Sequence, residues 1–291
     1  MSLFENLGEE IQHLRPPLTF QGNKKNLLKP FLKVLHSYNI TPGTIFVDVF
    51  GGSGLISHHL KQNYPQNRVI WNDFDDFAHR LEIAPITEKI RAHLCEIVAR
   101  DGFESKDSSG HERLKKETIS EIKSYLAGFD EDELDCIQLS NYLCFSGQYK
   151  DSKAELLRDD IKVIQYNHLP QSPINTRGYL QNGVERVQKD YRELIAKFGE
   201  NPHAFFVLDP PYLQTSEKTY TQHFRLADFL DLVKFFVTHP QPSVYFSSKR
   251  SDCAEFFEWY MAEKGIKNTI KTWKAALTIS KGKDTDIMFY K

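Results

Sequence analysis

The sequence has few cysteines, no long apolar run and no large excess of either charge sign. Its 291 residues include four cysteines, Cys95, Cys136, Cys144 and Cys253, and the absence of C-x-x-C spacing argues against a disulfide framework or a zinc site. No segment approaches the roughly 18 apolar residues that a membrane helix needs. The first residues, MSLFENLGEEIQ, carry acids where a signal peptide would carry basic and then apolar residues. We therefore expect a cytoplasmic protein with reduced thiols, no bound metal and no membrane partner.

Charge is balanced over the whole chain but is unevenly distributed along it. The 37 basic and 39 acidic residues give a net charge of −2, which does not indicate nucleic-acid binding. Residues 15–33 nevertheless contain basic side chains and no acid, whereas residues 101–135 are predominantly acidic. Because a local cleft of one sign can attract a polyanion, the charge pattern neither predicts nor excludes a nucleic-acid partner.

Short apolar runs alternate with helical segments in two parts of the chain. Strands are expected at 44–50, 68–71, 204–208 and 243–248, and helices at 55–62, 226–237 and 254–264. This alternation predicts an α/β fold in which a mostly parallel sheet is covered on both faces. The β-leaning stretches 269–276 and 286–290 flank Ser280-Lys-Gly-Lys283, which predicts an antiparallel C-terminal hairpin at the far edge of the sheet.

The middle of the chain differs from its two ends in polarity and in its expected secondary structure. Residues from about Pro85 to Leu180 are polar and read as mixed helix and loop. We interpret them as an inserted, smaller and mainly helical domain between two parts of one sheet. The predicted division is residues 1–84 and 181–291 for the domain that contains the sheet and 85–180 for the insertion.

A glycine cluster, Asp48-Val-Phe-Gly-Gly-Ser-Gly54, lies at a predicted strand-to-helix junction. Glycines there let the backbone approach a ligand, and the amides of the following helix favour a carboxylate or phosphate. Asp73 lies at the end of the next strand, 22 residues after Gly51. In dinucleotide folds an acid about 20 residues after the glycine motif binds a ribose hydroxyl. The pair predicts an adenosine-type cofactor, and the alternative is a tight turn without a ligand.

A second motif, Asp209-Pro-Pro-Tyr212, also follows an apolar strand, where ligands of open α/β sheets bind. Two prolines fix the backbone and supply no N–H, so a carboxylate and carbonyl groups can be held as acceptors beside a flat tyrosine ring. Such a set suits an exocyclic amine on an aromatic base. The alternative is a rigid turn with a capping aspartate.

Together these motifs resemble the S-adenosylmethionine-dependent DNA adenine-N6 methyltransferases of the Dam type (D12 class), which implies a Rossmann-like sheet. Asn141–Tyr149 is similar to a stretch that such enzymes carry before the recognition segment, whereas their R-Y-N-type and F-N-V-P-F-G-type sequences are not visible here. The resemblance implies that Asp209, Pro210, Pro211 and Tyr212 are catalytic. It implies that the residues near S-adenosylmethionine are Phe20, Gly22, Asn23, Lys24, Asp48, Phe50, Gly51, Gly52, Ser53, Gly54, Asp73, Asp190, Tyr191 and Asp209.

The resemblance predicts methyl transfer to N6 of an adenine flipped out of duplex DNA. Residues 85–180 would then recognise the target, and the basic residues between Lys150 and Arg177, with acids interleaved among them, are candidates for a DNA-facing surface. Two alternatives are methylation of RNA adenine or cytosine N4, and a non-catalytic DNA-binding module with a vestigial cofactor pocket. A cognate restriction endonuclease, as in restriction-modification pairs, is compatible with the resemblance but is not inferable from this chain.

Overall fold

The computed structural model divides the chain into two compact units. The first contains the chain up to Pro16, Gly22–Phe77 and Gly178–Lys291, and the second contains Pro17–Gln21 and Ala78–Arg177. The second unit overlaps the segment 85–180, whose part in target recognition stays a prediction. The structure describes residues 13–20, 22, 24–101, 103–106, 112–144, 148–158, 169–180, 183–211, 224–248, 253–265, 270–276 and 285–291.

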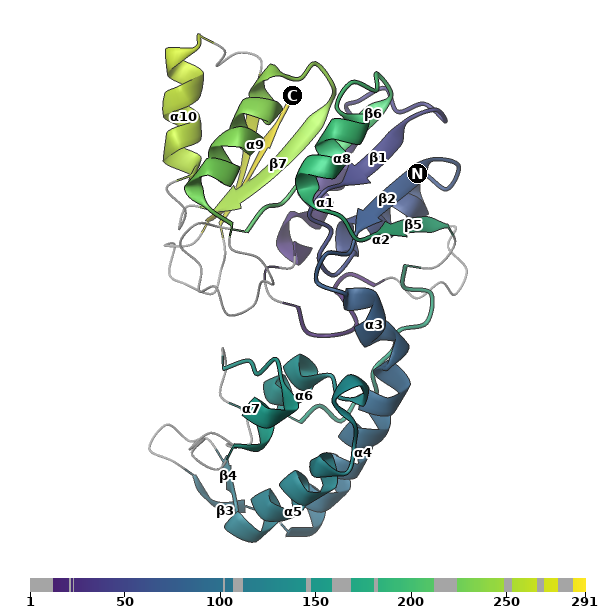
Figure 1. The fold of residues 1–291 in the computed structure, drawn as a ribbon, viewed down its shortest axis with the longest axis vertical. Coiled ribbons are helices and arrows are strands. Elements are labelled where there is room, and N and C mark those ends of the chain that lie inside the picture. Colours follow the sequence, from purple (N-terminus) through teal and green to yellow (C-terminus); the bar gives the residue numbers. More distant parts are fainter. Residues whose placement is uncertain are drawn as a thin grey trace. The chain divides into compact units, whose positions relative to one another are not determined.

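A seven-stranded sheet forms the centre of the first unit (Figure 1). The first five strands in the list below are mutually parallel, and β9 runs antiparallel to both of its neighbours. In spatial order the strands are β5 (Val184–Val187), β2 (Arg68–Asn72), β1 (Ile45–Asp48), β6 (Ala204–Leu208), β7 (Ser243–Ser248), β9 (Thr285–Tyr290) and β8 (Lys271–Ala276). The prediction of an α/β fold with a mostly parallel sheet and antiparallel C-terminal strands is confirmed, and the arrangement is consistent with a Rossmann-like methyltransferase sheet.

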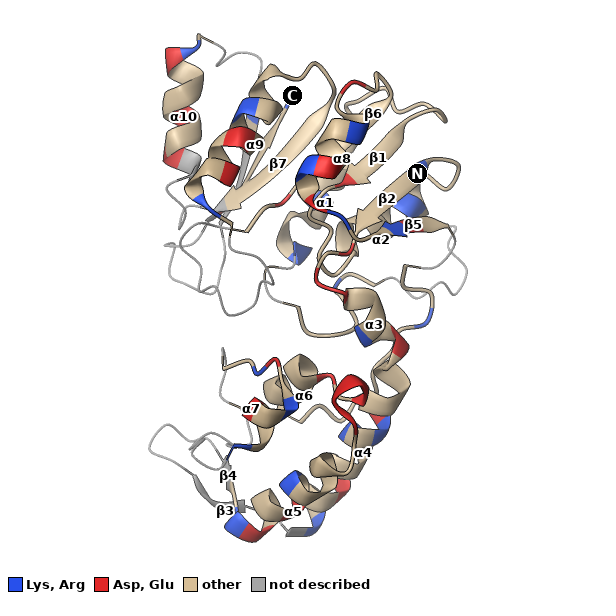
Figure 2. Ribbon diagram, in the orientation of Figure 1, with Lys and Arg blue, Asp and Glu red and all other residues tan. Residues whose placement is uncertain are grey.

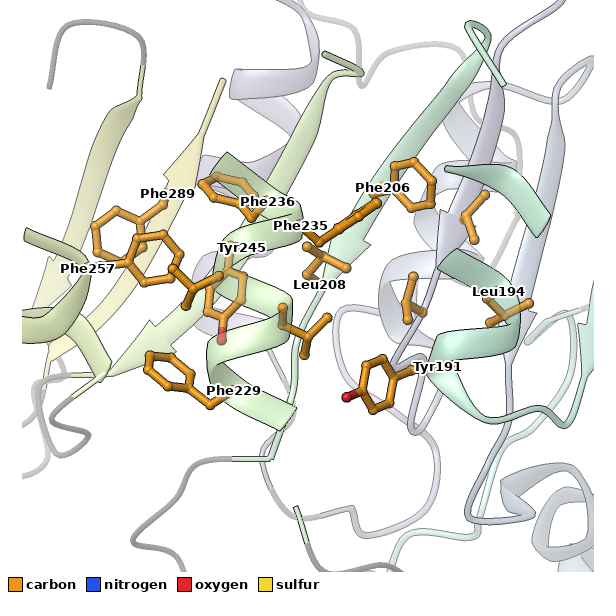
Figure 3. Packing of buried hydrophobic residues seen from close by; sticks show 14 of the residues in the cluster. Tyr191, Leu194, Phe206, Leu208, Phe229, Phe235, Phe236, Tyr245, Phe257 and Phe289 are labelled. Carbon is orange, nitrogen blue, oxygen red and sulfur yellow. The ribbon is translucent and has the colours of Figure 1, made fainter. Parts of the chain in front are cut away.

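Helices cover both faces of the sheet because its central strands are apolar on both sides. In β6, Phe205 and Val207 face one core cluster while Phe206 and Leu208 face the other. Figure 3 shows the second of these clusters, in which aromatic side chains fill the space between sheet and helices. Helices α1 (Lys25–Leu35) and α2 (Leu55–Asn63) cover one face, and the other is covered by α8 (Tyr191–Phe198), α9 (Leu226–Thr238) and α10 (Cys253–Glu263).

The second unit is mainly helical and has a core of its own. Apolar side chains of its helices, among them Ile90, Leu94, Ile122 and Leu139, pack together in one buried cluster. A two-stranded antiparallel ribbon, absent from the sequence-based expectation, lies beside them. The elements are α3 (Phe77–Glu82, whose first residue belongs to the first unit), α4 (Ala84–Asp101), β3 (Phe103–Lys106), β4 (Glu112–Leu114), α5 (Lys116–Ala127), the 3-10 helix η1 (Glu131–Glu133), α6 (Cys136–Leu143) and α7 (Lys153–Leu157).

Among the described residues, four other elements are absent from the sequence-based expectation: β5, α1, α3 and α8. The edge strand β5 was not predicted, because its sequence Val-Glu-Arg-Val is only half apolar and none of it is fully buried. Helix α1 was also not predicted, and it tolerates Pro30 in its interior. The proposed turn at Ser280–Lys283 lies outside the described residues, although β8 and β9 pair antiparallel as expected.

Candidate active site

Three aspartates lie at the carboxyl ends of three neighbouring parallel strands. Asp48 is the last residue of β1, Asp73 follows β2 and Asp209 follows β6. The registers place Asp48 beside Trp71 on one side and Val207 on the other. Ligands of open α/β sheets bind at this edge, so the strand order brings the two predicted motifs to one place.

The glycine loop after β1 adopts a backbone that favours glycine. Gly52 and Gly54 have φ values of 46° and 74°, in the left-handed region that other residues rarely adopt. At Gly51 the restriction is steric, because an added Cβ would collide with the indole ring of Trp71. The loop therefore needs glycine at these positions to lie as close to β2 as it does.

The loop presents its carbonyl groups to the protein and leaves two amides available. Every carbonyl from Gly51 to Gly54 accepts a hydrogen bond, and the donors are, in chain order, the amide of Gly54, the indole of Trp71, the hydroxyl of Tyr179 and the amide of His58. In the described part of the chain the amides of Gly52 and Ser53 have no acceptor. Successive amides of this kind bind anions such as carboxylates, and this favours a ligand over the alternative of an empty tight turn.

Asp48 lies beneath this loop and is buried. The Ser57 hydroxyl donates a hydrogen bond to its Oδ2 atom over 2.7 Å. Burial raises the pKa of the Asp48 carboxyl to about 7, and the neighbouring Asp209 carboxylate adds to the rise while the hydrogen bonds from Ser57 oppose it. Asp48 can therefore exchange a proton near neutral pH.

Asp209 forms an ion pair with Lys24. The ammonium Nζ lies 2.8 Å from Asp209 Oδ2 and also donates to the Gly22 carbonyl over 2.8 Å. Burial raises the pKa of the Asp209 carboxyl, and the Lys24 cation opposes the rise. Pro210 is buried and Pro211 is half-buried. The N-terminal motif and the Asp-Pro-Pro motif thus meet through one ion pair.

Asp73 is already engaged at both carboxylate oxygens. Its Oδ1 accepts the amide of Phe77 over 2.6 Å and so caps the start of α3. Its Oδ2 forms an ion pair with Arg186 Nε over 2.8 Å, and Arg186 also contacts Asp76. The adjacent Asn72 side chain bonds to backbone atoms of Val49 and Lys189. The ends of β1, β2 and β5 are therefore held together around the acid predicted to bind the ribose.

Three aromatic rings gather beside the glycine loop. We call Phe50, Tyr191 and Phe224 the aromatic group. The ring of Phe50 lies 5.4 Å from Tyr191 and 6.1 Å from Phe224, centroid to centroid. Asp190, which precedes Tyr191, caps α8 by accepting the Arg192 amide over 2.8 Å. Tyr191 is buried, whereas Phe50 and Phe224 are half-buried and offer flat apolar surface of the kind that holds a purine.

For three predicted residues, Phe20, Asn23 and Tyr212, the expected place at this edge stays a prediction. Phe20 lies in the second unit and is half-buried, while Gly22 lies in the first. Asn23 and Tyr212 fall outside the described residues. Sequence reasoning did not identify Tyr179, Arg186 or Phe224, which lie outside the recognised motifs, and only the buried acid Asp73 signals the need for a cation such as Arg186.

No group of three or more metal-binding side chains occurs among the residues that the structure describes. In the same residues no helix is both long and apolar enough to cross a membrane. Cys136 and Cys144 are buried free cysteines, and Cys95 is a half-buried free cysteine.

The comparisons with known proteins agree with this geometry. Residues 20–274 match the family model for D12 class N6 adenine-specific DNA methyltransferases. The chain belongs to this family. A Haemophilus influenzae protein named "Putative methyltransferase" is 35% identical over 268 residues, which cover 89% of this chain and 82% of that protein.

Membership in the D12 class supports an enzyme with methyltransferase activity. It also implies the use of S-adenosylmethionine and a DNA substrate. The residues of the carboxyl edge fit such a cofactor, because free loop amides, buried acids and an aromatic surface lie together there. This fit and the family match favour the enzyme over a non-catalytic binding module.

Proposed function

We propose that this protein methylates N6 of adenine in duplex DNA, on a base turned out of the helix. The observation that carries the proposal is the Asp209 carboxylate at the end of β6, paired with Lys24 and adjacent in the sheet to the glycine loop after β1. An amine held by Asp209 and a methyl donor held by the loop would lie at neighbouring strand ends. This proximity converts an encounter of two ligands into a reaction within one site.

Asp209 and Pro210 would hold the target amine. The lone pair of an exocyclic amine is delocalised into the base, so the free amine is a weak nucleophile. Hydrogen bonds from its two N–H groups to the Asp209 carboxylate and the Pro210 carbonyl would stabilise the positive charge that develops on nitrogen. Tyr212, outside the described residues, would stack on the base and offset the few kcal/mol that extrusion costs.

Lys24 favours the ionised form of Asp209, which can hold the amine. Its ammonium favours the ionised carboxylate, which accepts hydrogen bonds, over the acid form, which burial favours. The ammonium also occupies part of the acceptor capacity of Asp209. The incoming amine must therefore share the carboxylate with Lys24 or displace it.

The remaining residues of the edge would bind the cofactor. S-adenosylmethionine supplies an electrophilic methyl group with a neutral thioether as leaving group. The amides of Gly52 and Ser53 would bind its carboxylate, Asp48 its ammonium, and the aromatic group its adenine. Asp73 would bind the ribose. Because Arg186 already pairs with the Asp73 carboxylate, the ribose hydroxyls must share the carboxylate with Arg186 or displace Arg186 from it.

The second unit would recognise the DNA. Helix α5 carries charges of both signs, from Lys116, Glu117, Glu121 and Lys123, whereas the short 3-10 helix η1 carries only acids (Figure 2). Among the basic candidates, Lys153 is committed to the fold, because its ammonium donates to the carbonyls of Ala127, the last residue of α5, and of Phe129. Among the residues that the structure describes, no hydrogen bond or ion pair engages the Lys150 ammonium, so Lys150 is the better candidate for a phosphate contact. Lys150→Gln should lower the slope of log affinity against log salt by about 0.9, whereas Lys153→Gln should lower the stability of the second unit.

The test offers labelled S-adenosylmethionine with duplex DNA and with structured RNA, and maps the methylated positions. Methyl groups at adenine N6 of the duplex support the proposal. Labelling of RNA alone, or of cytosine N4, would show that the proposed substrate is wrong and that the proposed methyl transfer is right. Asp209→Asn serves as the control, and a variant that retained wild-type transfer would refute the catalytic assignment. DNA binding without any transfer would restore the non-catalytic alternative.

A further inference from the structure

The chain returns to the first unit through a short segment with an unusual backbone. Gly178 begins the return, and both Gly178 and Leu180 have positive φ values, of 78° and 54°. A leucine in this region is rare and costs free energy, so such a conformation persists only where surrounding contacts impose it. The contacts of this segment therefore indicate what the conformation achieves.

Leu180 is held against the start of α2. Its amide donates to Nδ1 of His58 over 3.2 Å, and burial together with the rings of His59 and His13 lowers the pKa of His58 to about 3. His58 therefore remains a neutral acceptor at any working pH. The leucine side chain fills the space that Gly54 leaves, since an added Cβ there would lie 2.6 Å from Leu180 Cδ1.

Between these two residues, Tyr179 reaches the glycine loop. Its side chain is almost fully buried, its ring lies 4.8 Å from that of His58, and its hydroxyl donates to the Ser53 carbonyl over 2.9 Å. That carbonyl shares a planar peptide with the Gly54 amide, which bonds to the Gly51 carbonyl over 2.7 Å. Tyr179 thus fixes the peptide that closes the loop.

The peptide on the other side of Ser53 is fixed separately. The Trp71 indole bonds to the Gly52 carbonyl over 3.2 Å, and the Ser53 amide belongs to the same peptide plane. The direction of the free Ser53 amide therefore depends on two bonds, one from Trp71 and one from Tyr179. Trp71 lies in the neighbouring strand β2, whereas Tyr179 lies outside every motif discussed above.

We propose that Tyr179 is a positioning residue for the glycine loop, and that its hydroxyl orients the loop amides toward the carboxylate of the methyl donor. The part that concerns the donor rests on the proposed function of the loop. The hydroxyl itself touches neither substrate, so its effect is on cofactor affinity and not on the chemical step.

The test compares Tyr179→Phe with Tyr38→Phe in the full chain. Both substitutions remove one hydroxyl that bonds to a carbonyl, but Tyr38 bonds to Lys291 over 2.7 Å, at the end of the sheet where β7 begins. We expect Tyr179→Phe to weaken S-adenosylmethionine binding roughly five- to twentyfold, because a buried carbonyl loses its donor. The kcat at saturating cofactor should stay within about twofold, and hydrogen exchange of the Gly54 amide should accelerate in the protein without ligand.

Wild-type affinity and wild-type Gly54 exchange in Tyr179→Phe would overturn the proposal. An equal loss of affinity in Tyr38→Phe would also overturn it, since the effect would then reflect general stability. Failure of the unsubstituted protein to bind S-adenosylmethionine would refute the proposed function of the loop. In that case the Gly54 exchange rate still decides whether Tyr179 holds the loop, because that measurement needs no cofactor.

Discussion

Replacing Asp48 by asparagine should stabilise the first unit at neutral and alkaline pH. The folded protein holds the pKa of this carboxyl at about 7, well above its ordinary value of 3.8, because the group is buried. An asparagine keeps an oxygen that can accept from Ser57 and carries no charge. The expected gain depends on pH, because wild-type Asp48 is neutral in acid.

The sign and size of the effect follow from proton linkage. Well below the ordinary pKa of 3.8 the carboxyl is protonated in both the folded and the unfolded chain, so burying it carries no ionisation cost. As pH rises toward 7, the unfolded chain ionises freely while the folded chain resists, and stability falls. At about 1.4 kcal/mol per pH unit, the difference between variant and wild type should grow by about 2–3 kcal/mol from pH 5 to pH 8.

Urea unfolding followed by tryptophan fluorescence would measure this difference. Trp71, Trp259 and Trp273 all belong to the first unit, so the signal reports on that unit alone. Asp231→Asn, on the exposed side of α9, is the matched control and should give a nearly constant difference. A difference between Asp48→Asn and wild type that does not change from pH 5 to pH 8 would show that Asp48 ionises normally in the fold.

Three further predictions concern individual site residues. Asp209→Ala should retain cofactor binding in calorimetry but lose methyl transfer, and near-normal turnover would remove Asp209 from the mechanism. Lys24→Met should move the pH of half-maximal kcat upward, because burial then raises the pKa of Asp209 without an opposing cation. Lys25→Met, at an exposed position, is the control. An unshifted pH profile in Lys24→Met would contradict the role of the ion pair. Asp73→Ala should weaken cofactor binding by about 1–3 kcal/mol and also lower the melting temperature, since it removes the cap of α3; unchanged affinity in calorimetry would point to Asp75 as the ribose acid.

The sheet could be predicted where strand sequences are apolar on both faces. The run Ala204–Leu208 is apolar throughout, and its strand bounds agree with the prediction. β5 escaped detection because an edge strand with alternating charges does not differ from a polar loop in its sequence. Its place beside β2 is set by pairing with Val69–Asn72, which no local pattern reveals.

The candidate site shows the same limit. The glycines and Asp209 could be identified because short motifs carry them, and the strand order places those motifs side by side. Arg186 and Tyr179 could not be identified, since each is defined by a partner more than 100 positions away, Asp73 and Ser53 respectively. Long-range hydrogen bonds of buried groups arise only when the chain has folded around them.

Cofactor affinity should rise with pH over the range in which folding stability falls, because both depend on the ionisation of Asp48. In the proposed site Asp48 takes the ammonium group of a positively charged ligand, so the ligand binds the ionised form. Below pH 7 that form is a minority, and each further pH unit should reduce affinity by up to about tenfold. Calorimetric titration of S-adenosylmethionine between pH 6 and pH 8 measures this slope, and Asp48→Asn should abolish it while binding more weakly throughout. An affinity that is constant over this range in the wild type would mean that the ammonium group is bound elsewhere, and that the buried acid serves only to anchor the loop through Ser57.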